Sequence, residues 1–336
     1  MRLRLLSVVP WVVLCVLPAF GNGYSQYILN LTLVNVTIVV GLNLLLGYAG
    51  QFAFSHAALM GIGAYTAALL AARLGVSFWI ALPLAGVVSA VIGSLAAVQA
   101  MRLRRVYLAL VTIAFAELIV WVFTNWRSVT LGTDGVSLPA PSLFGWDINS
   151  GTRIYFVVLA CTAMMWWLAR RILGSHVGRS FIAIRENEIL AQCSGINVPL
   201  TKTVAFALSA FYAGIGGALF ALVLGFIVPS SFDLLTLITQ FAAVVLGGQM
   251  SLIGSAIGAA LLTILPEALR DFQGLQEVVY GVVLIACVVF MPRGIAGVLQ
   301  HFGVLPVEVL ARHWRALQPS AATPQPMRPP VGDGSQ

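Results

Sequence analysis

Long runs of apolar residues, separated by short polar stretches, make up most of the chain. Ten of these runs approach or reach the roughly 20 residues that a helix needs to cross the hydrocarbon of a bilayer. They cover residues 5–20, 28–46, 55–72, 78–100, 106–124, 154–169, 204–228, 234–248, 252–266 and 278–291. The pattern predicts an all-α fold, a polytopic transmembrane helical bundle of about 10 helices (8 to 10), because an isolated segment satisfies its backbone in lipid only as a helix.

Two parts of this pattern have a second interpretation. Residues 1–23 also resemble a signal peptide, with arginines ahead of an apolar core and small residues at a cleavage site near residue 20. Its cleavage would leave the later topology unchanged. Residues 234–266 could instead form one long tilted helix with a re-entrant piece, because four glycines in this stretch permit breaks.

Composition and charge agree with a membrane protein. The chain is 60% apolar and only 9% charged, with a mean hydropathy of +0.97, far from the values of soluble domains. Its net charge of +7 comes from basic residues scattered between the apolar runs, which argues against nucleic-acid binding. With the N-terminus in the cytoplasm, 14 of the 18 Lys and Arg residues fall inside, so we expect both termini to be cytoplasmic.

No catalytic or metal-binding motif is visible. The four cysteines and four histidines are dispersed, so the sequence predicts neither a disulfide framework nor a metal site. The single lysine, Lys202, follows Thr201 where a phosphate-binding loop would require glycine. We therefore expect no cofactor on this chain, and any ATP must be hydrolysed by another protein.

A glycine-rich stretch over residues 47–72 carries polar residues inside an apolar run. Gln51, Ser55 and His56 are candidates for a translocation pathway, because polar groups at membrane depth usually face the bundle interior or water. Simple helix packing is the alternative for the glycines, since small residues let backbones approach closely. The stretch also tolerates an interrupted helix.

A fainter copy of this stretch follows in the second half of the chain. Residues 46–51 read LGYAGQ and residues 246–249 read LGGQ, which adds Gly247, Gly248 and Gln249 to the candidates. Paired, glycine-interrupted apolar segments in two halves of a chain are typical of the midplane site of a transporter. Glu117, within the run over residues 106–124, is a further candidate, with a structural hydrogen bond between helices as the alternative.

A basic and amphipathic island separates two long apolar runs. Over residues 178–195 apolar residues alternate with Arg, Glu and Asn, which predicts one short amphipathic helix that stops at Gly195. Mixed acidic and basic residues suit a protein groove better than a lipid surface. The residues of interest are Arg179, Phe181, Ile184, Arg185, Glu186, Asn187, Glu188 and Gly195.

Four blocks resemble a known family in order and spacing. They are LNLLLGYAGQFAFSHAALMGIGAYTAALLA, GRSFIAIRENEILAQCSGINVPLTKTVAFALSAFYAGIGGALFA, VVLGGQMSLIGSAIGAALLTILPEALRD and VYGVVLIACVVFMPRGIAGVL. The chain thus resembles the permease subunits of bacterial branched-chain amino acid ABC importers of the LivM type, over most of residues 42–299. It differs from the family pattern at Ser55 and Met250, where glycine is expected, and at Ser255, where proline is common.

This resemblance implies a function and a set of partners. The chain would form half of the translocation pathway in the bacterial inner membrane, with a second homologous permease subunit, two ABC ATPase subunits that bind ATP and Mg²⁺, and a periplasmic substrate-binding protein. Residues 179–195 would be the coupling helix that contacts an ATPase. A urea or short-amide permease of the same superfamily, or a stand-alone secondary carrier or channel, are the alternatives.

The chain divides into two parts. Residues 1–300 are predicted to be a transmembrane permease domain, with a cytoplasmic coupling segment over residues 171–203. Residues 301–336 are rich in proline and cannot bury enough apolar surface to fold, so a disordered cytoplasmic tail is expected.

Overall fold

Helices form almost all of the chain for which the computed structural model describes a conformation. The described residues are 14, 22–100, 105–139, 142–143, 146–147, 151–268, 281–282 and 294–301. The longer helices are α3 (Gly23–Asn43), α4 (His56–Leu74), α5 (Phe78–Ala100), α6 (Arg105–Asn125), α8 (Gly151–Gly174), α9 (His176–Glu186), α11 (Val198–Leu224), α12 (Leu234–Gly247) and α13 (Leu252–Ala268). The short elements are η2 (Leu44–Tyr48), α7 (Arg127–Thr130), η3 (Gly132–Asp134), α10 (Glu188–Cys193), η4 (Pro229–Phe232), α15 (Gly294–His301) and the strands β1 (Val136–Ser137), β2 (Ser142–Leu143), β3 (Trp146–Asp147) and β4 (Phe226–Ile227).

The predicted apolar runs correspond closely to these helices. Eight of the ten runs fall within the described residues, and each of them contains a helix. Among the described residues, six helices are long and apolar enough to cross a membrane, or seven if α6 and the segment bent by 69° after it form one span. The runs over residues 5–20 and 278–291, the signal-peptide interpretation and the tail lie outside the described residues, apart from a few positions.

The run over residues 234–266 contains two helices. α12 ends at Gly247, the chain turns through residues 248–251, and α13 begins at Leu252. A single continuous helix over this run is therefore excluded, and the break falls at the glycines that permitted one. Gly248 has φ of 111° and Met250 has φ of 63° in this turn, which a helix does not allow. The two helices then pack on each other through Gly247 and Gly254, where a Cβ on either residue would overlap the backbone of the other helix.

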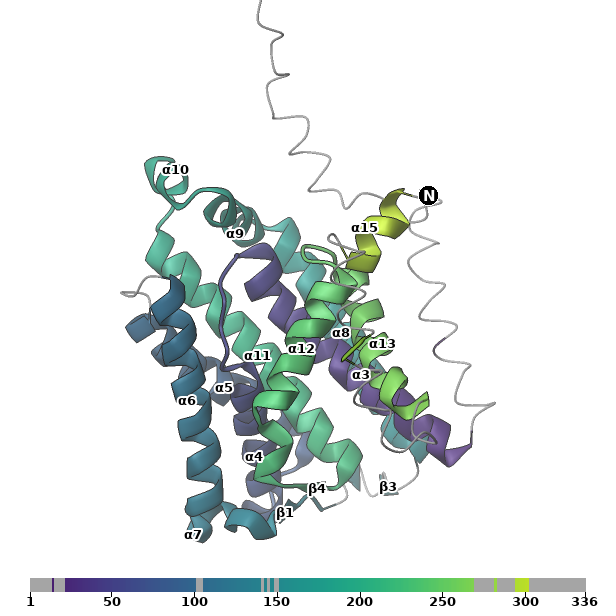
Figure 1. Ribbon diagram of the computed structural model, residues 1–336. Coiled ribbons are helices and arrows are strands. Elements are labelled where there is room, and N and C mark those ends of the chain that lie inside the picture. The colour runs from purple at the N-terminus through teal and green to yellow at the C-terminus, as the bar shows by residue number, and fades with distance from the viewer. Residues whose placement is uncertain are drawn as a thin grey trace, which may run out of the picture.

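The centre of the bundle is α11, which packs against α3, α4 and α5 (Figure 1). Contacts with α4 are made backbone to backbone. A Cβ on Gly63 would overlap the Gly214 backbone, and a Cβ on Gly217 would overlap the Met60 carbonyl oxygen. In lipid, where no hydrophobic force drives helices together, such close packing of small residues supplies the attraction.

The two ends of the bundle differ. Figure 1 shows α9 and α10 at one end, which we call the α9 end, and α7, β1 and β4 at the opposite end, which we call the β1 end. At the β1 end, β1 pairs antiparallel with β4, with Val136 opposite Ile227. This pairing ties the segment after α6 to the end of α11.

One helix begins inside the bundle. α3 continues into the single π-helical turn η2, and after it residues 49–55 are non-helical until α4 begins at His56. The Phe54 ring stacks on Phe241, at the middle of α12, with 4.8 Å between ring centroids. The connecting segment therefore runs from the α9 end into the bundle, as Figure 1 shows. The interrupted helix that the glycines suggested is present, and its irregular backbone is held within protein, as a membrane requires.

Candidate functional site

The amphipathic island consists of two helices. Asn187 has an extended backbone (φ −159°, ψ 113°) that ends α9, and its Oδ1 accepts hydrogen bonds from the backbone N–H groups of Ile189 and Leu190 at 3.0 and 3.1 Å, which starts α10. The prediction of a single helix over residues 178–195 is therefore wrong, because an asparagine in this position competes with the helical backbone. Gly195, with φ of 82°, does follow the end of α10.

The two helices differ in what they bury. Phe181 and Ile184 of α9 are buried against the bundle, whereas Ile189 and Leu190 of α10 are 72% and 65% exposed. The apolar residues predicted to form one face of a single helix are thus divided between two helices. Those of α9 are buried within the chain, and those of α10 are exposed.

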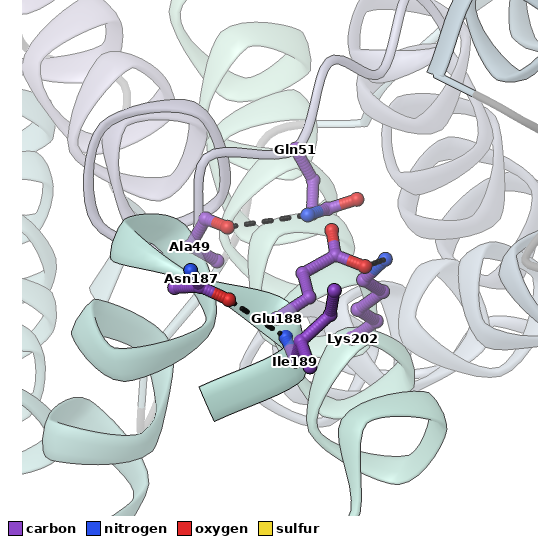
Figure 2. Close-up of polar contacts among 6 residues, drawn as sticks. All are labelled: Ala49, Gln51, Asn187, Glu188, Ile189 and Lys202. Carbon is purple, nitrogen blue, oxygen red and sulfur yellow. Dashed lines mark hydrogen bonds and ion pairs between the residues drawn. The ribbon is translucent and has the colours of Figure 1, made fainter. Parts of the chain in front are cut away.

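An ion pair holds α10 to α11. Glu188 Oε2 lies 2.8 Å from Lys202 Nζ, and Figure 2 shows the two side chains reaching toward each other from α10 and α11. Both groups are partly buried, and the pair spans the turn that contains Gly195. Arg179 and Glu186 of α9 and Asn187 are exposed. The ion pair therefore holds α10 in a fixed position relative to α11.

Arg185 points into the protein. One terminal nitrogen of its guanidinium donates to the Gly47 carbonyl oxygen in η2, and the other donates to Gln249 Oε1, in the turn after α12, at 3.1 Å. The alkyl part of the side chain lies against Gly50, where a Cβ would come within 2.9 Å of Arg185 Cγ. Gly50 has φ of 66°, so a residue without a side chain is needed there for two reasons.

Half-burial of this guanidinium affects its charge. Removal of water lowers the pKa of Arg185, while the negative charge of Glu186 and the nearby Tyr48 act in the opposite direction. The guanidinium still keeps its positive charge, because the ordinary pKa of arginine lies far above neutral pH. A positive charge is therefore held between the two glycine-rich segments.

The two glycine-rich segments also contact each other. Asn43, which is fully buried at the end of α3, donates to Ser255 Oγ at 2.6 Å and to the Ser251 carbonyl at 3.0 Å, and its Oδ1 accepts from the Met250 N–H at 3.3 Å. The departures from the family pattern at Met250 and Ser255 thus lie at this junction. The positive φ at Met250 explains the expectation of glycine there.

The candidate residues of the first segment are buried. Gln51 Nε2 donates to the Ala49 carbonyl at 3.3 Å (Figure 2), and Ser55 is buried just before α4. His56 Nδ1 lies 3.0 Å from Gln240 Oε1, which links the start of α4 to the middle of α12. This pair places polar groups in the interior of the bundle.

Glu117 lies apart from this junction. It is exposed on α6 and lines a shallow pocket together with Phe54, Ala57, Phe232 and Asp233. Phe54 and Ala57 flank the start of α4, so the pocket lies beside the start of this helix.

Sequence reasoning missed several members of this arrangement. Arg185 and Gln249 were both candidates, but for two different sites, and the structure brings them together. Asn43 and Gln240 were not considered, although each is a polar residue inside an apolar run, which was a usable signal. Within the described residues, no three His, Cys, Asp or Glu side chains are grouped so as to hold a metal.

A family comparison identifies the chain. Residues 24–289 match the family described as the permease component of the branched-chain amino acid transport system. This match covers well over half of the chain, including both helix breaks and the α9 and α10 segment. The chain belongs to this permease family.

Individual relatives agree with the family. The permease is 32% identical to LivM of Salmonella typhimurium, a high-affinity branched-chain amino acid transport system permease protein, over 83% of this chain and 71% of the relative. It is 32% identical to LivM of Escherichia coli, over 80% of this chain and 69% of the relative. It is 25% identical to the ribose import permease RbsC of Haemophilus influenzae, over 72% of this chain and 76% of the relative. No solved structure matches it.

Together with its helices, the family establishes the broad role of this chain. It is a multi-pass inner-membrane protein and a permease subunit of an ABC importer, and thus a transport component without an enzymatic activity of its own. The recognition of the LivM type from the four sequence blocks is confirmed.

Proposed function

We propose that this permease forms half of the translocation pathway of an ATP-driven importer for branched-chain amino acids. Its partners would be a second homologous permease, two ABC ATPases that bind ATP and Mg²⁺, and a periplasmic substrate-binding protein. The substrate assignment is supported by the two relatives at 32% identity, both named for branched-chain amino acids, whereas the ribose permease is more distant.

The exposed apolar pair on α10 is the observation that carries the coupling part of this proposal. Ile189 and Leu190 lie on a short helix outside the bundle, where the positive-inside pattern predicts cytoplasm. Two large aliphatic side chains in that position favour burial by another protein, since each gains roughly 1.5–3 kcal/mol when removed from water. Because the Glu188 and Lys202 ion pair joins α10 to α11, a displacement of α10 would be transmitted directly to α11.

The pathway part of the proposal involves Glu117. Its neighbours on the exposed side of α6 include Leu118 and Trp121, so this face is largely apolar yet carries a carboxylate. A charge facing lipid costs several kcal/mol, which favours a face that meets water or the second permease. The other residues proposed for the pathway are Gln51, Ser55 and His56, next to the start of α4, and Gly247, Gly248 and Gln249, at the break after α12.

Reconstitution tests the proposed function. We expect proteoliposomes that contain this permease, the second permease and both ATPases, supplied with the binding protein and internal ATP, to accumulate labelled leucine. Omission of any one component, or of ATP, should reduce uptake to background. Uptake by the purified chain alone along an ion gradient would instead show a secondary carrier, and competition by urea but not by isoleucine or valine would show an amide permease.

Water access at position 117 tests the pathway. In a background with the four cysteines changed to serine, we expect Glu117→Cys to react with a membrane-impermeant thiol reagent in the assembled transporter. Met164→Cys is the matched control, because Met164 is 67% exposed near the middle of α8. Labelling at 117 should exceed labelling at 164 by about tenfold or more, since thiolate forms only where water reaches. Equal labelling would remove Glu117 from the pathway.

A further inference from the structure

Arg185 lies where the C-terminal ends of three helices meet. α9 ends one residue after it, η2 ends one residue after Gly47, and α12 ends two residues before Gln249. The last carbonyl groups of a helix have no partner within the helix and carry partial negative charge. A cation at such a meeting point is stabilised by each helix end, which accounts for a half-buried arginine without a carboxylate partner among its hydrogen bonds.

The geometry requires arginine rather than any cation. The two hydrogen bonds leave from two different nitrogens of one planar guanidinium and go to two segments that are distant in sequence. A lysine ammonium is a single point of charge, so it lacks the fixed fork that holds two acceptors apart. Gly50 completes this binding site for the Arg185 side chain, because the alkyl part of Arg185 occupies the space that a side chain at position 50 would fill.

The helix that carries Arg185 is itself firmly attached. Phe181 and Ile184 are buried, and α9 packs against α8, α11 and η2. Gly178 lies so close to Leu173 that a Cβ would come within 2.5 Å of the Leu173 Cα. Movement of α9 therefore carries Arg185 with it, and through Arg185 it acts on both breaks at once.

We infer that Arg185 is a positioning residue that joins the α9 and α10 segment to both glycine-rich helix breaks, so that the three move as one body during transport. It acts within the chain and does not contact an ATPase, whereas α10 makes that contact. The transport measurement that tests this inference rests on the proposed function. The tie, by which we mean the two hydrogen bonds from Arg185 to Gly47 and Gln249, is a property of the chain alone.

Hydrogen exchange of the purified permease tests the tie. In Arg185→Gln, which removes the charge and the fork, we expect the backbone amides of residues 44–51 and 246–251 to exchange about tenfold faster or more, as expected for the loss of charged hydrogen bonds. In Gln249→Ala, which keeps the Gly47 bond, only residues 246–251 should respond strongly. Arg179→Gln is the matched control, because Arg179 is exposed on the same helix.

The assembled transporter supplies the second readout. Arg185→Gln should retain ATP hydrolysis, but its uptake per ATP should fall by about tenfold or more. The uptake per ATP of Arg185→Lys should lie between that of Arg185→Gln and that of the unsubstituted protein, because lysine restores at most one of the two hydrogen bonds. Unchanged exchange at either segment, or unchanged uptake per ATP, would overturn the inference. If Arg185→Gln does not fold, Arg185→Lys and Gln249→Ala decide it. If no combination of partners supports uptake, the proposed function fails and the exchange data still decide the tie.

Discussion

Valine in place of Gly217 is expected to abolish recovery of folded permease. Gly217 of α11 faces the Met60 carbonyl oxygen of α4, and its missing Cβ would also lie 3.0 Å from the Ala64 nitrogen. These atoms belong to a helix backbone and cannot turn aside as a side chain would. The helices must separate, and α11 would lose packing against its other neighbours as well, at a cost of ~3 kcal/mol or more.

Size-exclusion chromatography after mild detergent extraction measures this effect. We expect at least about a tenfold loss of the monodisperse peak, because a bundle with its central crossing forced open does not hold together. Gly174→Val is the matched control, since a Cβ on Gly174 of α8 meets no atom within 4 Å. Normal recovery of the Gly217→Val protein would show that α4 and α11 do not cross as described.

Aspartates at positions 189 and 190 should abolish uptake without disturbing the fold. Ile189 and Leu190 are largely exposed, so their replacement removes little packing within the chain. In the assembled transporter the same positions would bury aspartate against the ATPase, which costs more than the loss of the apolar contacts alone. We expect at least about 2 kcal/mol per residue, enough to prevent co-purification of the ATPases and transport.

Co-purification and uptake measured on the same preparation check this result. Leu74→Asp is the matched control, because Leu74 is 70% exposed at the end of α4, near the β1 end. That variant should keep its ATPases, which places the effect on one end of the bundle. Full ATPase capture by the Ile189→Asp, Leu190→Asp variant would locate the coupling surface elsewhere on the chain.

The membrane-spanning elements were predictable because the bilayer leaves little choice. In hydrocarbon every backbone group needs an internal partner, so an apolar run of sufficient length becomes a helix. The described runs confirm this, and the glycines at residues 47–50 and 247–248 correctly indicated breaks. The break at Asn187 was missed, although asparagine favours helix starts, because the alternation of apolar and charged residues continued across it.

The orientation of Arg185 had a signal in the sequence that went unused. Arg185 lies four residues after Phe181, so helical geometry places it next to this residue on the buried side of α9. Its charge suggested an outward position, as for Arg179. Charge is a weaker guide than helical spacing here, because unpaired helix ends can solvate a cation inside the protein.

The sequence by itself determined that this protein lies in the membrane, which apolar runs form helices and to which family the chain belongs. These properties depend on local composition and spacing, because an apolar run of sufficient length partitions into lipid and must form a helix there to satisfy its backbone. Only the tertiary structure decided that Arg185 meets both Gly47 and Gln249, and that His56 meets Gln240. Partners so far apart in sequence are selected by how the helices pack, and the packing depends on contacts across the whole bundle.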